Sequence, residues 1–253
     1  MSKAIVLLVL TFSLLSSAFS AKLDKRSSCE LGTNGLPQLG PQIVVIYDLS
    51  EPYPQVVIRN ILTRLQSELS EVSPQTRLTL FIFDRSNAFH TSIPIDSFCL
   101  AGKYSSFDPF APNRNILTRR RQAEIKRLES FLLDNNPREA TAGSPIVNAF
   151  VSAVTSQNVV TVATEIKAFL ISDLVEYSNV ANFYDNYLNV AGAKSLARRV
   201  NETMPELQKV SNVTFLYVKR EKYVKIQNDF LVLFWSELMA LRGAKSTTFV
   251  SIH

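Results

Sequence analysis

The chain has 253 residues, with 27 lysines and arginines against 22 aspartates and glutamates, and a formal net charge of +5. This length fits one large domain, or a domain with a long insertion. The small charge excess gathers in clusters such as 119–121 and 219–222, which are typical of solvated faces and do not indicate nucleic-acid binding.

Residues 1–20 predict a secretory signal peptide. Lys3 provides an early positive charge, residues 4–18 are apolar, and residues 18–20 offer small side chains at the two positions that a signal peptidase reads. We therefore expect cleavage before Ala21, an exported protein in the periplasm or outside the cell, and no stable membrane span after cleavage. An uncleaved membrane anchor is the alternative, although the apolar run is short for a span.

Residues 21–41 are polar and rich in glycine and proline, which predicts a tail before the domain. Residues 43–47 form an unbroken apolar run, typical of a strand that is buried on both faces. Apolar residues then repeat every four positions over 57–69, which predicts an amphipathic helix. The apolar run at 78–83 predicts the second strand.

The segment 85–115 is predicted as a long loop that contains an edge strand at 89–95. A loop of this length inside a compact domain is usually functional or pinned to the body. Cys99 lies in this loop and Cys29 lies in the tail. In an exported protein such a pair predicts a disulfide, with two unpaired thiols as the alternative.

The second half of the chain continues the alternation. Residues 117–133 predict a basic amphipathic helix, and another helix opens at 143–145, where Ser144 would serve as N-cap before a proline. A strand is predicted at 165–172 and is followed by a loop at 174–192 that is rich in tyrosine and asparagine.

The remaining predicted elements are a helix at 193–200, a strand at 213–218, a helix at 226–241 and a strand at 247–252. Strands that alternate with helices indicate right-handed crossovers and a parallel sheet. The sequence therefore predicts a three-layer, doubly wound α/β fold, with a mainly parallel sheet and helices on both faces. Residues 42–253 would form this single domain.

Two predicted strands each end in a carboxylate, at Asp48 and at Asp173. The carboxyl ends of the strands are the edge of an open α/β sheet where ligands bind. Ser50 lies two residues after the first carboxylate, and Ser144 opens a helix between the two strands. Carboxylate and hydroxyl oxygens are suitable ligands for a hard divalent cation such as Mg²⁺.

These residues give the chain a resemblance to the von Willebrand factor type A family. That family has a metal-ion-dependent adhesion site built from three loops at the C-terminal edge of its sheet. Asp48 and Ser50 match the first loop, Asp-x-Ser-x-Ser, whose final serine is replaced by Pro52. Ser144 falls where the family has a threonine, and Asp173 matches the third loop without the glycine that commonly follows it.

The resemblance follows the element order over residues 43–253. It implies the von Willebrand factor A-like fold, in a form similar to exported bacterial members with a partly degenerate site. It further implies a bound Mg²⁺, or Mn²⁺ or Ca²⁺, and a protein partner whose carboxylate completes the metal's coordination. The predicted ligands are Asp48, Ser50, Ser144 and Asp173.

Each predicted ligand also has a structural interpretation. Ser144 would cap the helix that it opens, and Ser50 would cap the helix that begins near Pro52. Asp48 and Asp173 would accept hydrogen bonds from backbone N–H groups of their own loops.

The same edge holds the residues that we expect to contact a partner, which are Glu51, Glu176, Tyr177 and Tyr184. Aromatic side chains near a ligand edge often anchor protein interfaces. The alternative is that Phe183 and Tyr187 of the same loop pack on the domain surface and only stabilise the loop. The sequence has two histidines and no recognisable nucleophile elbow, zinc-protease or phosphate-loop motif, so it does not predict an enzyme.

We therefore expect an adhesion or assembly module. The alternatives are a metal-free structural component of an envelope or secretion assembly, and a metal-dependent hydrolase with Glu51 or Glu176 as general base.

Overall fold

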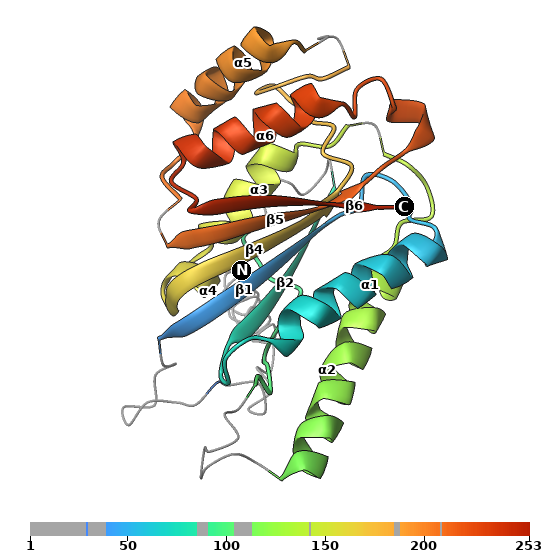
Figure 1. Cartoon of the computed structure of the whole chain (residues 1–253), viewed down its shortest axis with the longest axis vertical. Helices are drawn as coiled ribbons and strands as arrows, with labels where there is room; N and C mark the ends of the chain where they lie inside the picture. Colours follow the sequence, from blue (N-terminus) through green and yellow to red (C-terminus); the bar gives the residue numbers. More distant parts are fainter. Residues whose placement is uncertain are drawn as a thin grey trace, which may run out of the picture.

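The computed structural model describes residues 29, 39–84, 91–103, 113–141, 143–184, 188–207 and 209–253. Within this part of the chain, one sheet has six strands in the order β3-β2-β1-β4-β5-β6 (Figure 1). Neighbouring strands are parallel except for the antiparallel pair β2 and β3. The strands are β1 (Gly40–Asp48), β2 (Arg77–Phe83), β3 (Asp96–Cys99), β4 (Ala163–Ser172), β5 (Val210–Val218) and β6 (Ser246–Ile252).

The two central strands, β1 and β4, set the position of the candidate site. Val44, Val45 and Ile46 of β1 are fully buried, because the strand pairs with β2 on one side and β4 on the other and is covered on both faces. The strand order reverses between β1 and β4. This reversal is the topological switch point, outside which ligands bind in open α/β sheets.

Helices cover both faces of the sheet, as predicted (Figure 1). On one face, Ile43 and Val45 of β1 pack with apolar residues of α1 and α2. On the other face, Val44 and Ile46 pack with residues of α3, α5 and α6, because successive side chains of a strand point to opposite sides. The helices are α1 (Gln55–Ser70), α2 (Arg114–Asp134), α3 (Ile146–Val154), α4 (Gln157–Val160), α5 (Val190–Thr203) and α6 (Asp229–Leu241).

Three helices begin at positions that asparagine caps explain and that apolar periodicity alone misses. The side chains of Asn113, Asn189 and Asn228 accept hydrogen bonds from backbone N–H groups of α2, α5 and α6. As a result α2 and α5 begin three residues before the predicted starts, and α6 begins three residues after its predicted start. The short helix α4 was not predicted.

The predicted position of the edge strand, 89–95, is wrong. Residues 85–90 lie outside the described part of the chain, and the strand β3 begins only at Asp96. The apolar side chain that β3 buries is Phe98, whereas Ile93 is 74% exposed. Pairing with β2 is thus set by the residue that can enter the core, and not by the apolar composition of the preceding segment.

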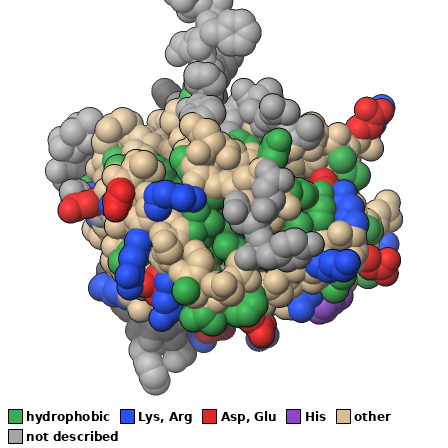
Figure 2. Space-filling view, turned by 90° about the horizontal axis from the view of Figure 1, so that it is seen from above, with side chains coloured by type: hydrophobic (Ala, Val, Ile, Leu, Met, Phe, Trp, Pro, Cys, Tyr) green, Lys and Arg blue, Asp and Glu red, His purple; other side chains and the backbone are tan. Residues whose placement is uncertain are grey.

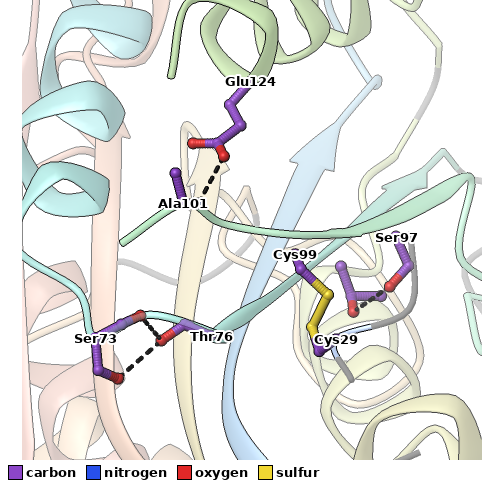
Figure 3. The surroundings of a disulfide bond; sticks show 8 residues. Cys29, Ser73, Thr76, Ser97, Cys99, Ala101 and Glu124 are labelled. Carbon is purple, nitrogen blue, oxygen red and sulfur yellow. Dashed lines mark hydrogen bonds between the residues drawn. A yellow bond between two sulfur atoms is a disulfide. The ribbon is translucent and has the colours of Figure 1, made fainter. Parts of the chain in front are cut away.

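The predicted disulfide is confirmed, between Cys29 and Cys99 (Figure 3). It attaches residue 29 to the end of β3, across 70 positions of sequence. The segment after the bridge is also held, because the Ala101 N–H donates to Oε1 of Glu124 on α2 at 2.6 Å. The described part of the predicted loop, 91–103, is therefore held to the body before Cys99 by the pairing of β3 with β2 and after it by Glu124.

The predicted signal peptide, 1–20, and most of the predicted tail, 21–41, lie outside the described residues; β1 already begins at Gly40. Among the helices that the structure describes, none is long and apolar enough to cross a membrane. Figure 2 views the molecule from the side on which α5 lies in Figure 1, and shows side chains of both charge signs dispersed among hydrophobic ones.

Candidate functional site

Asp48 ends β1 and lies in the interior, with 0% of its surface exposed. Its Oδ1 accepts a hydrogen bond from the Ser50 N–H at 2.9 Å. Its Oδ2 accepts from the hydroxyl of Ser144 at 2.9 Å and from the hydroxyl of Ser172 at 2.7 Å. The structure therefore brings together three of the four predicted ligands around one carboxylate, with Ser172 added.

The surroundings of Asp48 have opposing effects on its protonation. Burial is the largest effect and leaves the pKa of this carboxyl above its usual value, although the hydrogen bonds from Ser50, Ser172 and Ser144 lower it. These bonds therefore offset only part of the cost of ionising the carboxyl in the interior.

The helix-capping alternatives for the serines are wrong. Helix α3 has Pro145 at its N-cap and α1 has Pro54, and neither receives a side-chain capping hydrogen bond. Ser144 instead directs its hydroxyl to Asp48, 96 residues earlier in the sequence. The alternative proposed for the carboxylates is confirmed, because both accept backbone N–H groups from their own loops.

Asp173 follows β4, in a tightly held loop. Its Oδ1 accepts the Val175 N–H at 2.9 Å. Leu174 has a φ of 62°, in the left-handed region that favours glycine. Its N–H donates to Ser172 Oγ at 2.9 Å, and its carbonyl accepts the Trp235 indole N–H at 3.1 Å. These contacts offset the backbone strain and fix the direction of the carboxylate.

Burial raises the pKa of Asp173 to about 7, and the negative charge of Asp48 adds to the shift. Two buried carboxylates at one edge thus need a nearby positive charge if both are to ionise. Arg220 provides such a charge, since it lowers the pKa of Asp173.

Arg220 was expected on a solvated face, and that expectation is wrong. Its side chain is only 13% exposed, and Nε lies 3.5 Å from Oδ2 of Asp173 while Nη1 lies 3.2 Å from Oε2 of Glu51. Nη1 also donates to the carbonyl of Pro52 at 3.0 Å. The guanidinium group stands 4.9 Å from the ring centre of Tyr53. Its Nε makes no hydrogen bond with any described residue, so the contact with Asp173 is an ion pair alone.

Glu51 was expected to contact a partner, but its side chain already contacts several groups of this chain. Besides Arg220, its carboxylate meets Lys222 Nζ at 2.6 Å and accepts the Tyr223 hydroxyl at 2.5 Å. It is buried. In this conformation its carboxylate is part of the domain's own charge network.

Glu176 is fully buried, so its carboxylate does not line the surface. Its Oε2 accepts the Val147 N–H at 2.8 Å, in the first turn of α3. Burial raises the pKa of this carboxyl to about 8. Its position at a helix N-terminus is favourable for negative charge, but the lack of solvent favours the protonated form.

Tyr177 and Tyr184 do lie on the surface, at 42% and 44% exposure. Their ring centres are 5.6 Å apart, and Tyr184 lies at the same distance from Tyr223. We call these three residues the tyrosine row. Gly143 makes room for it: a Cβ there would come within 2.6 Å of Cδ1 of Tyr177, and its φ of +98° also disfavours other residues.

A cavity of about 180 Å³ adjoins the tyrosine row. Tyr184 and Lys222 belong to its wall, so it connects the row to the charge network of Glu51. Its lining is aromatic, aliphatic and basic: Phe183, Tyr184, Leu188, Lys222, Lys225, Ile226 and Asn228.

Asp48, Ser50, Ser144 and Asp173 suit a hard divalent cation in the chemistry of their oxygen atoms. Their arrangement does not fit one, because the Arg220 guanidinium already lies against Oδ2 of Asp173. Two unit charges about 4 Å apart repel by about 4 kcal/mol at an effective dielectric of about 20, and a divalent ion doubles this. Within the described residues there is also no group of three or more His, Cys, Asp or Glu side chains that could hold a metal.

Sequence reasoning missed three residues of this edge, Ser172, Arg220 and Gln227. A usable signal existed for two of them. Ser172 directly precedes Asp173, and Arg220 lies two residues after the end of β5, as Ser50 lies two residues after the end of β1. Because parallel strands end at one edge, the residues just after β5 belong to the same site.

No protein-family model matches the chain, and no curated protein matches its sequence. Solved structures that are similar in part include the three that follow. The PilB minor pilin from Streptococcus sanguinis is 10% identical with a TM-score of 0.41, over 85% of this chain and 57% of that chain. The human COPII-coat protein Sec24c is 12% identical with a TM-score of 0.36, over 89% of this chain and 32% of that chain.

The third structure, the manganese-loaded Plasmodium vivax TRAP protein, is 10% identical with a TM-score of 0.34, over 85% of this chain and 68% of that chain. The chain thus spans 57% and 32% of the length of the first two structures. At these identities the function has to be argued from the residues of the site.

Proposed function

We propose that the chain is an exported protein-binding module, with an adhesion or assembly role, that contacts its partner through the C-terminal edge of the sheet. The observation that carries this proposal is the tyrosine row, in which Tyr177 and Tyr184 are exposed beside a buried charge network at the switch point between β1 and β4. Aromatic side chains contribute much of the binding energy at protein interfaces, because they bury a large area at low entropic cost.

The disulfide supports the exported location. Disulfides persist in oxidising compartments such as the periplasm or the extracellular space, and Cys29 is bonded to Cys99. The signal peptide and its cleavage before Ala21 remain predictions of the sequence and belong to the same proposal.

The geometry favours binding over hydrolysis. A general base must reach the proton of a bound substrate or water. Glu176 is fully buried and bonded to the α3 N-terminus, and Glu51 is held by Lys222 and Tyr223. Neither candidate base is open to a substrate in this conformation.

The metal-free form of the module has its own supporting observation, the ion pairs of Arg220 with Glu51 and Asp173. The bound Mg²⁺, Mn²⁺ or Ca²⁺ stays a prediction of the sequence. A metal-free structural component of an envelope or secretion assembly would use the same edge.

The proposal can be tested by site-specific photo-crosslinking in cells that naturally produce the protein. A photoreactive amino acid at position 184 should crosslink a discrete partner, because that side chain is exposed on the tyrosine row. The matched control is position 157, which is exposed in α4 before β4, and therefore lies towards the opposite edge of the sheet.

A partner crosslinked from position 184 and not from 157 supports the proposal, and its loss in a Tyr177→Ala background strengthens it. Equal crosslinking from both positions, or none from position 184, contradicts it.

A further inference from the structure

We infer that the Arg220 guanidinium takes the place of a metal ion at the C-terminal edge of the sheet. It compensates the charge of the buried carboxylates, and the edge keeps its structure without a bound metal. This inference concerns the site of the proposed function, and only its consequence for partner binding rests on that function.

The backbone at Arg220 is held in place by one buried amide side chain. Gln227 accepts the Arg220 N–H at 2.7 Å through its Oε1. Its Nε2 donates to the carbonyls of Asp173 and Val218, both at 2.9 Å. Gln227 therefore joins the ends of β4 and β5 and sets the distance from Arg220 to the Asp173 loop.

The side chain is fixed as well, so this is not a mobile surface arginine. Its Nη1 donates to the carbonyl of Pro52, and its plane lies near the ring of Tyr53. Pro52 has no side-chain oxygen to offer a metal ion, and its backbone oxygen is used by the arginine instead. A guanidinium with its donors directed in a plane is suited to such simultaneous contacts.

The balance of charge gives the arginine its role. Asp48, Glu51 and Asp173 are buried carboxylates at one edge. Arg220 is paired with both Glu51 and Asp173, whereas the other cation, Lys222, is 55% exposed and is paired with Glu51. Among the described residues, the ion pair that reaches Asp173 is the one with Arg220. Because the guanidinium is covalently part of the chain and its contacts hold it at the edge, this cation cannot dissociate from the site as a metal ion can.

The consequence is a binding edge that does not depend on the supply of divalent ions. If the guanidinium is removed while the carboxylates and serines remain, an anionic, oxygen-lined site is left. Such a site should then take up a hard cation. The inference therefore predicts that metal sensitivity appears on loss of the arginine.

The experiment compares the thermal unfolding of the purified exported protein with its R220M variant, in EDTA and in millimolar Mg²⁺, Mn²⁺ or Ca²⁺. We expect the wild-type Tm to be the same in all buffers. R220M should melt lower in EDTA by roughly 10 °C, because a buried charge has lost its partner. It should recover part of that loss in Mn²⁺, by preferential binding to the folded state.

Two further variants complete the design. R127M removes an arginine whose ion pair with Asp96 is exposed, and should show no metal response. R220K keeps the charge without the planar donors, and should stay insensitive to metals with an intermediate Tm. If R220M does not fold in EDTA, its refolding yield with and without Mn²⁺ provides the same comparison.

The inference is overturned if the wild-type Tm rises with a divalent ion and the rise is lost in Asp48→Asn. It is also overturned if R220M responds to metals no more than R127M does. The photo-crosslinking result is independent of both, so the expected metal response without a crosslinked partner would remove the proposed function and leave the role of Arg220 standing.

Discussion

The C-terminal edge and the β3 flank both use arginine–carboxylate pairs, but only the edge buries them. On the flank, Arg127 binds Asp96 with both partners partly in solvent, and also lies 4.3 Å above the ring of Phe98. At the edge, Arg220 meets two carboxylates that are at least nine-tenths covered. The same arginine–carboxylate pair is therefore exposed to solvent on the flank and buried at the edge.

The difference shows that burial, and not the number of ion pairs, distinguishes a site from a solvated surface. Exposed pairs contribute roughly 0–1 kcal/mol, because water and salt screen them and ordering their side chains costs entropy. Removal of one partner from a buried pair costs about 3–5 kcal/mol, since the remaining charge is left without compensation. Three predictions can break or sharpen this contrast.

The largest effect is expected from Asp48→Ala. The substitution leaves the hydroxyls of Ser144 and Ser172 and the Ser50 N–H without their acceptor in the interior. We expect the free energy of unfolding to fall by about 3 kcal/mol or more, measured by urea denaturation. Arg127→Ala is the flank control and should cost less than about 1 kcal/mol. Similar losses in the two variants would remove the contrast between the regions.

The second largest loss of stability is expected on the β3 flank. A disulfide holds the flank, whereas ion pairs hold the C-terminal edge. Replacement of Cys29 and Cys99 by serine opens a link across 70 positions of sequence and should cost about 2–4 kcal/mol. Unfolding with and without a reductant measures this. The double variant should not respond to the reductant, and a wild-type protein of unchanged stability on full reduction would contradict the structural role of the bridge.

The smallest of the three effects concerns pH and Glu176→Gln. Burial raises the pKa of Glu176 from 4.5 to about 8. Between these values the folded protein keeps a proton that the unfolded chain releases, so wild-type stability should fall as the pH rises from about 4.5 to about 8. Glutamine does not titrate. The variant should match the wild type below about pH 4.5, and its advantage in stability should grow up to about pH 8 and stay constant above that.

Denaturation curves at several pH values test this prediction. Asp173, whose pKa is raised to about 7 by burial and by Asp48, contributes the same trend to both proteins and so cancels in the comparison. Parallel stability profiles for the wild type and Glu176→Gln would show that Glu176 ionises normally in the folded state.

Local pattern predicted most of the fold. The apolar runs that became β1, β2, β4 and β5 are long and largely buried, so their hydrophobicity identifies them. The last strand, β6, buries only Ile252, and its β-branched and aromatic residues predicted it instead. The edge strand is different. It has only four residues and one buried side chain, Phe98, so it depends on its partner strand and on the disulfide more than on its own composition.

The sequence by itself determined that Asp48 and Asp173 lie at one edge, because both end parallel strands and parallel strands share a direction. Only the tertiary structure decided how those carboxylates are satisfied. The local sequence of the charged run at 219–222 does not indicate whether its side chains face water or the interior. Arg220 is directed inward by Gln227, seven residues later, and by Pro52, 168 residues earlier, and no local periodicity predicts either contact. The burial of Glu176 has the same origin, since desolvation depends on the packing of every neighbouring element.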